Sequence, residues 1–147
     1  MPVVPRGRHL TGVLSWRLRP WLNLLHSVAA LRLVEKRSMD LNKTVSVLVS
    51  TWAYQEVFYG SDESNRPLIR KRTNATLRSL LAHRSGARYD LSNSALARYT
   101  THKEWTINSG ATVNYRSGYP LVFELNTAWE YRTGVHWVKQ LIECLTG

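Results

Sequence analysis

The sequence predicts an α+β fold, mainly helical, in which a single domain carries a C-terminal β-hairpin and follows a basic N-terminal arm. Apolar residues recur at helical spacing in several stretches, and a turn sequence separates two extended stretches near the C-terminus. The first 34 residues contain no aspartate or glutamate. The predicted division is therefore an arm or helix over residues 1–38 and one domain over residues 39–147, which is an ordinary length for a single core.

The N-terminal arm has the composition of an organellar transit segment, because arginines stand among leucine, tryptophan and serine without any acid. A secretory signal is the alternative, although Asn23, His26 and Arg32 interrupt the apolar stretch. An amphipathic helix over residues 21–37 also fits, and no uninterrupted apolar run approaches the ~20 residues of a membrane span. We expect a mitochondrial location, or one in another organelle.

Residues 41–59 fit two patterns. Val45, Val47 and Val49 alternate with polar residues, as in a strand, whereas Asp40 and Gly60 frame a helix of ordinary length. Length favours the helix, and both alternatives stay open.

Three further helices and one hairpin are expected. The first helix runs from Pro67, behind a Ser64 or Asn65 cap, to Gly86. The other two helices and the hairpin are predicted from capping residues, turn residues and apolar stripes. They are a helix over residues 91–103 capped by Asp90 or Ser92, a hairpin of residues 113–116 and 119–125 around Ser117 and Gly118, and a last helix over residues 135–145.

The strongest functional signal is a basic block. Residues 66–103 hold nine lysines and arginines against one acid, within a chain whose net charge is +10. Such residues neutralise phosphates, and the acid-free arm adds to them. The predicted polyanion-binding residues are Arg66, Arg70, Lys71, Arg72, Arg78, Arg84, Arg88, Arg98 and Lys103 of the block, and Arg6, Arg8, Arg17 and Arg19 of the arm.

Aromatic residues are interleaved with the basic block. Tyr89, Tyr99 and Trp105 are candidates for stacking on unpaired bases. The alternative to nucleic-acid binding is that the basic residues form a solvated helix face and that the aromatic residues belong to the core.

No catalytic, metal or cofactor signature is recognisable. The five histidines are scattered without ligand spacing, and the single cysteine provides no partner for a thiolate metal site. We therefore predict no catalytic residue, no metal and no cofactor.

These observations predict a non-enzymatic structural subunit of a large ribonucleoprotein, namely an RNA-binding ribosomal protein of the mitochondrion or another organelle. Its partners would be ribosomal RNA and neighbouring protein subunits. The alternative is an accessory subunit of a respiratory or ATP synthase complex of the mitochondrial inner membrane, in contact with other subunits and anionic lipid. A third interpretation is a small enzyme with dispersed site residues, for example His102 or His136 against a carboxylate.

Overall fold

A computed structural model of the chain places four helices, two short 3-10 turns and one pair of strands among the residues that it describes. The described residues are 10–63, 67–71, 75–88, 93–106, 119–131 and 133–147, and the side chains of residues 10–19, 51, 54 and 71 are not described.

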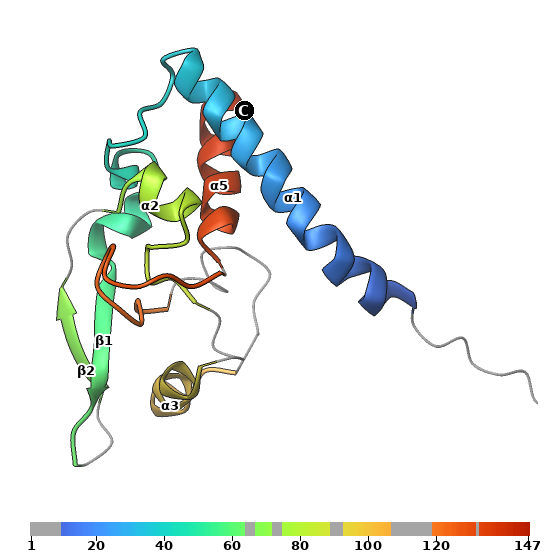
Figure 1. The fold of residues 1–147 in the computed structure, drawn as a ribbon. Helices are drawn as coiled ribbons and strands as arrows, with labels where there is room; N and C mark the ends of the chain where they lie inside the picture. The colour runs from blue at the N-terminus through green and yellow to red at the C-terminus, as the bar shows by residue number, and fades with distance from the viewer. Residues whose placement is uncertain (1–9, 64–66, 72–74, 89–92, 107–118, 132) are drawn as a thin grey trace, which may run out of the picture.

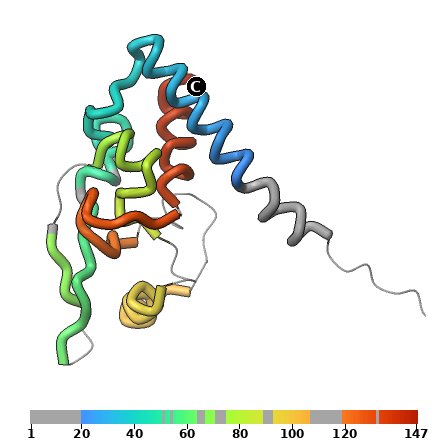
Figure 2. The backbone as a smooth tube through the Cα atoms, viewed as in Figure 1, coloured from blue at the N-terminus to red at the C-terminus, as the bar shows by residue number. Residues whose placement is uncertain are grey.

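Two helices from opposite ends of the sequence pack together. Helix α1 (Leu10–Glu35) and helix α5 (Gly134–Thr146) lie side by side (Figures 1 and 2). Ala30 of α1 is fully buried at this contact. None of the described helices is both long and apolar enough to cross a membrane.

The main core lies under α5. Its members come from α1, from the 3-10 turns η1 (Val45–Val47) and η2 (Ser50–Tyr54), from strand β1 (Glu56–Ser61), and from the short helix α2 (Leu77–Leu81). Trp137 of α5 meets Trp52 edge to face, with ring centroids 5.4 Å apart. Gly134, the first residue of α5, packs so closely on α2 that an added Cβ would lie 2.7 Å from the carbonyl oxygen of Leu80.

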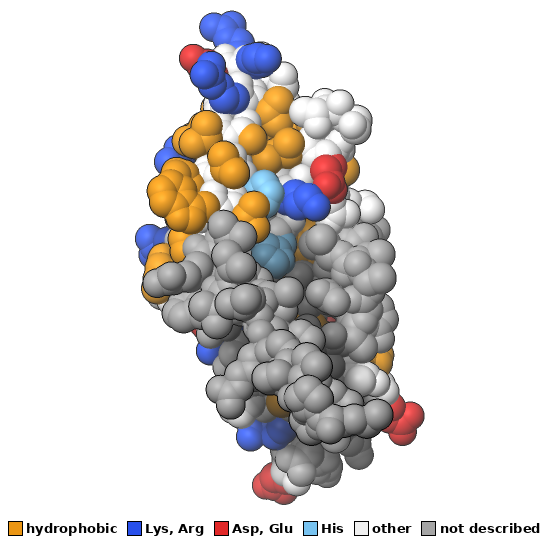
Figure 3. All heavy atoms as spheres, turned by 90° about the vertical axis from the view of Figure 1, so that its right-hand side faces the viewer, with side chains coloured by type: hydrophobic (Ala, Val, Ile, Leu, Met, Phe, Trp, Pro, Cys, Tyr) orange, Lys and Arg blue, Asp and Glu red, His pale blue; other side chains and the backbone are white. Residues whose placement is uncertain are grey.

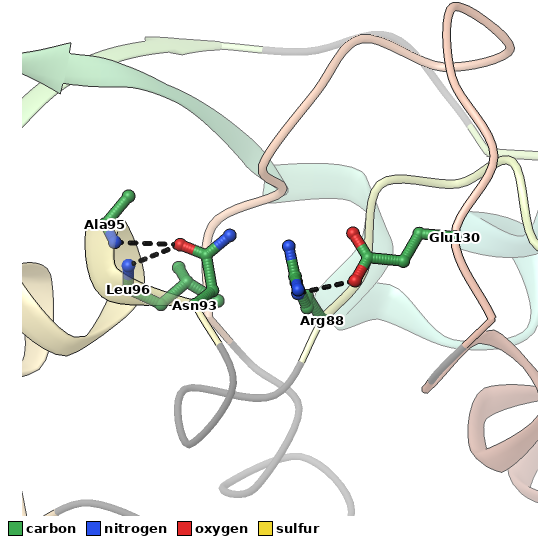
Figure 4. Close-up of polar contacts among 5 residues, drawn as sticks. All are labelled: Arg88, Asn93, Ala95, Leu96 and Glu130. Atoms are coloured by element: carbon green, nitrogen blue, oxygen red, sulfur yellow. Dashed lines mark hydrogen bonds and ion pairs between the residues drawn. The ribbon is translucent and has the colours of Figure 1, made fainter.

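A second, smaller core lies beneath helix α3 (Ser94–His102). Phe58, Leu96, Tyr99 and Tyr119 are its buried members. Asn93 caps α3, because its side-chain oxygen accepts hydrogen bonds from the backbone N–H groups of Ala95 and Leu96 at 2.9 and 3.0 Å (Figure 4).

The strands are not where the sequence placed them. Strand β1 pairs antiparallel with β2 (Pro67–Lys71), and the register slips between Phe58 and Gly60. Of the two alternatives left open for residues 41–59, the favoured helix is wrong, since two 3-10 turns and strand β1 lie there. The predicted helix over residues 67–86 is wrong for much of its length, because it contains β2 and only the short helix α2. Pro67 begins a strand instead of a helix, which it can do because the first residue of a strand does not need to donate to the ladder.

The predicted C-terminal hairpin is also wrong in its second strand. Residues 119–125 form no strand, and Leu121 makes only an isolated parallel bridge with Val57. Two hydrogen bonds hold it, from the N–H of Phe58 to Leu121 at 2.8 Å and from the N–H of Leu121 to Glu56 at 2.7 Å. The proposed first strand, residues 113–116, lies outside the described residues.

The last helix is confirmed, since α5 covers the predicted range with Val138 and Leu141 buried on its apolar stripe. The helix over residues 91–103 is confirmed in a shorter form as α3. The N-terminal helix is longer than expected and contains Pro20. The division of the chain at residue 38 stays a prediction.

Candidate functional site around Tyr131

The segment before α5 is held against the turn that follows α2. The backbone N–H of Glu130 donates to the carbonyl oxygen of His83 at 3.0 Å. The Glu130 carboxylate also pairs with the guanidinium of Arg88 at 2.6 Å, and both side chains are only 23% exposed (Figure 4). The ion pair with Arg88 and the backbone hydrogen bond to His83 therefore hold residues 129–131 in place.

Tyr131 receives contacts from two other parts of the chain. The side-chain amide of Asn23, on α1, donates a hydrogen bond to its hydroxyl. The His83 ring lies against the Tyr131 ring with centroids 4.6 Å apart. Tyr131 is nevertheless 43% exposed, so that a small molecule can reach it.

His83 adopts a backbone conformation that is unusual for its residue type. The N–H groups of His83 and Arg84 bond to the carbonyls of Leu80 and Ser79 at 3.2 and 2.8 Å, which is the Schellman ending of a helix. In this motif His83 takes the left-handed position, with φ +56°, where glycine is usual. Strained residues of this kind cluster at functional sites.

The ring of His83 is favoured in its neutral form. Burial lowers its pKa below the ordinary value, and its Nδ1 is buried without a hydrogen-bond partner among the described residues. Trp129 adds an edge-to-face contact at 6.2 Å. A neutral imidazole packed against the ring of Tyr131 therefore adds a titratable group to this site.

His26 lies on α1 one turn after Asn23, on the same side of the helix. Burial lowers its pKa, and the positive charge of Lys139 on α5 lowers it further, while Glu143 acts in the opposite direction. The Nδ1 of His26 is likewise buried and has no described partner.

Acidification below about pH 6.5 is expected to destabilise the chain through these two histidines. Because each pKa is lower in the folded state than the ordinary 6.5, the unfolded chain binds protons first as the pH falls. The contribution of the two neutral histidines to the free energy of unfolding is therefore complete above about pH 6.5 and declines below that pH. The midpoints of urea unfolding at pH 7.5 and 5.5 measure this loss of stability. The variant His26→Gln should lose less stability between the two pH values, whereas the exposed control His102→Gln should lose as much as the unchanged chain. Equal declines in the two variants would contradict this account.

No group of three or more histidine, cysteine, aspartate or glutamate residues within the described part of the chain is arranged to hold a metal ion. The polar groups that the structure brings together at Tyr131 are its own hydroxyl, the amide of Asn23 and the imidazole of His83.

Comparison with known proteins finds a family whose model matches most of the chain. Residues 24–147 match the beta-lactamase family.

The chain belongs to the beta-lactamase family.

Curated relatives within this resemblance are enzymes by name. Monacolin J acid methylbutanoyltransferase of Aspergillus terreus is 29% identical over 132 residues, which are 89% of this chain and 32% of the relative. Lovastatin esterase of Penicillium rubens is 29% identical over 126 residues, covering 84% of this chain and 32% of that enzyme. The chain thus spans about a third of the length of the curated relatives it matches.

Solved structures agree with the family assignment. The LovD6 mutant of simvastatin synthase from Aspergillus terreus superposes with a TM-score of 0.73 at 30% sequence identity, over 85% of this chain and 29% of that one. The unliganded selenomethionyl form of the synthase gives a TM-score of 0.71 at 27% identity, over 85% of this chain and 31% of that one. The small, mainly helical α+β domain predicted from the sequence is therefore wrong as a fold class, and the fold is of the beta-lactamase/transpeptidase type.

The predicted function, class and partners are wrong as well. The relatives are acyltransferases and an esterase, which act on small molecules, and nothing among them is a ribosomal, RNA-binding or respiratory subunit. The prediction that this is not an enzyme is overturned by the same relatives. Excess positive charge indicates only that polyanions are attracted, and it does not identify a function.

The structure disperses the predicted polyanion-binding residues. Arg70 and Arg98 are exposed on β2 and α3 respectively. Arg78 bonds to Asn42 at 2.9 Å, and Arg84 bonds to the carbonyl of Asn126 at 2.6 Å. Arg88 forms the ion pair with Glu130. Arg17 and Arg19 lie in α1 and Lys71 in β2, while Arg6, Arg8, Arg66 and Arg72 lie outside the described residues.

The predicted stacking residues belong mainly to the second core. Tyr99 is 7% exposed and packs edge to face on Phe58 and Trp105, and Lys103 lies over its ring at 5.9 Å. Trp105 is 40% exposed and also contacts Tyr119. Tyr89 lies outside the described residues. Polyanion binding by these residues stays a prediction.

The class A β-lactamases use a serine nucleophile followed by lysine at the third position, with S-D-N and K-T-G motifs elsewhere. None of the three motifs occurs in these 147 residues. The nearest pattern, Ser85 with Arg88, is inside the core, where Ser85 is 2% exposed and its hydroxyl accepts from the N–H of Ala87 at 3.4 Å. Ser85 is therefore not placed to attack a substrate.

Sequence reasoning missed Asn23, His83, Trp129 and Tyr131. No motif spacing joins positions so far apart, and His83 was counted only as one of five scattered histidines. The single local signal is that His83 follows an apolar helical stretch at the position where a glycine is usual.

Proposed function

We propose that this chain works in an acyl-transferring or ester-cleaving enzyme. In that enzyme it lines the site where the Tyr131 hydroxyl contacts the acyl group. The observation that carries the proposal is the hydroxyl of Tyr131, which is oriented by Asn23, flanked by His83 and open to solvent. The names of the relatives, methylbutanoyltransferase and lovastatin esterase, support acyl esters as the substrate class.

Tyr131 has the chemistry that an ester carbonyl requires. A phenolic hydroxyl donates a hydrogen bond to a carbonyl oxygen and can pass its proton onward. Because the amide of Asn23 donates to the phenolic oxygen, the hydroxyl hydrogen stays available for a ligand. The exposed ring of Trp129, beside His83, offers an apolar surface for the acyl chain.

The role of these residues is to bind the ester and to handle its proton. No serine of this chain stands in the S-x-x-K pattern, so none of its residues is given the covalent acylation step. A mitochondrial or other organellar location remains a separate proposal, which rests on the acid-free N-terminal composition alone.

Replacing Tyr131 by phenylalanine should weaken ester binding while leaving the fold intact. Losing one hydrogen bond to a neutral carbonyl costs about 0.5–1.5 kcal/mol, which corresponds to roughly twofold to tenfold weaker binding. The measurement is a ligand-observed NMR titration of phenyl methylbutanoate into the chain.

Tyr59→Phe is the matched control for this titration. Tyr59 is also exposed, its hydroxyl is bonded to Glu124, and it lies on β1. The control should bind the ester like the unchanged chain. Absence of saturable binding, or equal affinities for the Tyr131 and Tyr59 variants, would contradict the proposal.

A further inference from the structure

A hollow on the surface lies between the end of α1, the segment that follows it and α2. Its volume is about 500 Å³, which is within the range of small-molecule sites. Figure 3 shows lysine and arginine side chains gathered over the end of α1, at the top of that view. The hollow shares no residue with the Tyr131 site, and α1 ends at Glu35, about 18 Å along the helix from Asn23.

Three cations from three separate segments line this hollow. Arg37 follows α1, Lys43 precedes η1, and Arg78 belongs to α2. All three are exposed, and none of them pairs with an acid within the described part of the chain. Asp40 also lines the hollow, but its carboxylate already accepts a hydrogen bond from the backbone N–H of Asn42 at 2.8 Å. Three cations and one carboxylate leave two positive charges in excess, so the hollow attracts an anion.

Backbone hydrogen bonds hold the walls of the hollow together. The N–H of Arg78 donates to the carbonyl oxygen of Leu41, and the N–H of Val45 donates to that of Ala75, both at 2.9 Å. The guanidinium of Arg78 is also oriented, because its Nε donates to the side-chain oxygen of Asn42 at 2.9 Å. This bond uses Nε alone and leaves the terminal N–H groups of Arg78 as donors for a ligand. The site is therefore largely formed before a ligand binds.

Arg37 occupies a position where glycine would be more stable. The N–H groups of Arg37 and Ser38 bond to the carbonyls of Val34 and Leu33, both at 2.9 Å, which is the Schellman ending of α1. Arg37 therefore takes the left-handed conformation, with φ +58°, which costs energy for any residue with a Cβ. Because strained residues cluster at functional sites, the strain indicates a use for the arginine side chain.

The lining matches a phosphate that is attached to an organic group. A phosphate monoester carries about −1.5 to −2 charges at neutral pH and three acceptor oxygens, which fit an excess of two positive charges on three cations. A carboxylate would supply one charge and two oxygens. The apolar part of the lining consists of Val34, Met39 and Leu41, which are half-buried against the main core and offer a surface for the organic group.

We propose that this hollow binds a small organic phosphate monoester. The phosphate lies between Arg37, Lys43 and Arg78, and the organic group lies on Val34, Met39 and Leu41. This site is separate from the ester site at Tyr131, and it does not depend on the function proposed for that site.

A titration with phenyl phosphate provides the first test. The chain is labelled with ¹⁵N and titrated in about 0.15 M salt, which screens non-specific attraction. We expect saturable shifts of the backbone amides of residues 37–43 and of Arg78. Phenyl sulfate has nearly the same shape but a single negative charge, and it should bind at least roughly threefold more weakly. Inorganic phosphate lacks the organic group and should also bind more weakly than phenyl phosphate.

Variants of the lining provide the second test. Lys43→Gln and Arg37→Gly should each weaken the binding of phenyl phosphate roughly threefold or more. Arg37→Gly should in addition melt at the same or a higher temperature, because glycine adopts this φ without strain. An arginine with only a structural role would not combine these two effects. Lys36→Gln is the matched control, since Lys36 is exposed beside Arg37 but lies outside the lining, and it should bind like the unchanged chain.

Four outcomes would overturn the proposal. They are no saturable shift over residues 37–43, equal affinities for phenyl phosphate and phenyl sulfate, equal weakening by Lys43→Gln and Lys36→Gln, and unchanged affinity in both Arg37→Gly and Lys43→Gln. The third outcome would show that only the net charge of the chain attracts the phosphate.

Discussion

Gly86→Ala is expected to destabilise the chain by about 3 kcal/mol or more. Gly86 has φ +80°, which alanine adopts only with strain. An added Cβ would also stand 2.4 Å from the carbonyl oxygen of Phe123 and 3.2 Å from the Cβ of Leu121. The N–H of Val122 bonds to the carbonyl of Gly86 at 2.9 Å, so the two segments cannot separate without losing that bond.

The variant Gly60→Ala measures the cost of the backbone conformation in the absence of a steric clash. Gly60 also has a positive φ, +142°, but no atom would lie within 4 Å of its added Cβ. This control should lose only the cost of the backbone conformation, about 1–2 kcal/mol. Urea unfolding followed by circular dichroism measures both variants, and a Gly86 variant no less stable than the Gly60 variant would refute the prediction.

The turn at Gly86 also supports the candidate site. His83 and Arg88, on either side of the turn, hold Glu130 through its backbone N–H and its carboxylate respectively. Any displacement of the turn therefore moves Tyr131, and we expect Gly86→Ala to weaken ester binding along with stability.

Trp137→Ala is the second large loss expected, about 3–5 kcal/mol. Trp137 is 1% exposed and lies at the centre of the main core, where it contacts Trp52. Alanine would leave a cavity between α5 and the 3-10 turns, and rigid neighbours fill such cavities only in part.

Trp129→Ala is the matched control for Trp137, because Trp129 is 64% exposed. It should change the free energy of unfolding by no more than about 0.5 kcal/mol. Thermal unfolding of the two variants distinguishes them, and a Trp137 variant as stable as the Trp129 variant would contradict the prediction.

The helices that could be predicted are those whose stability comes from a periodic apolar stripe. In α5, Val138 and Leu141 recur at helical spacing and are buried as the pattern required. In α3 the stripe was found, but the cap proved to be Asn93, since its side chain accepts from two backbone N–H groups.

Residues 41–71 could not be predicted because local and tertiary preferences disagree there. Helical and strand patterns coincide around Val45 and Val49, and pairing of β1 with β2 decides the outcome for the residues that follow. A cap and proline pattern at Ser64 and Pro67 is equally compatible with the start of a strand.

The basic block misled the functional prediction for a similar reason. Charge along a sequence does not say whether each cation faces the same surface. In the structure Arg88 pairs with Glu130, Arg84 bonds to a backbone carbonyl, and Arg98 is exposed on a different element. Only tertiary structure brings Asn23, His83 and Tyr131 together.

Chemical labelling tests the central claim most directly. An aromatic sulfonyl fluoride, which modifies tyrosine hydroxyls, is added with and without phenyl methylbutanoate, and the seven tyrosines are mapped by mass spectrometry. If Tyr131 lines an acyl-ester site, the ester will protect it and will leave Tyr59, which is 51% exposed, unprotected. Protection of neither tyrosine, or of both to the same extent, would contradict an acyl-ester site at Tyr131.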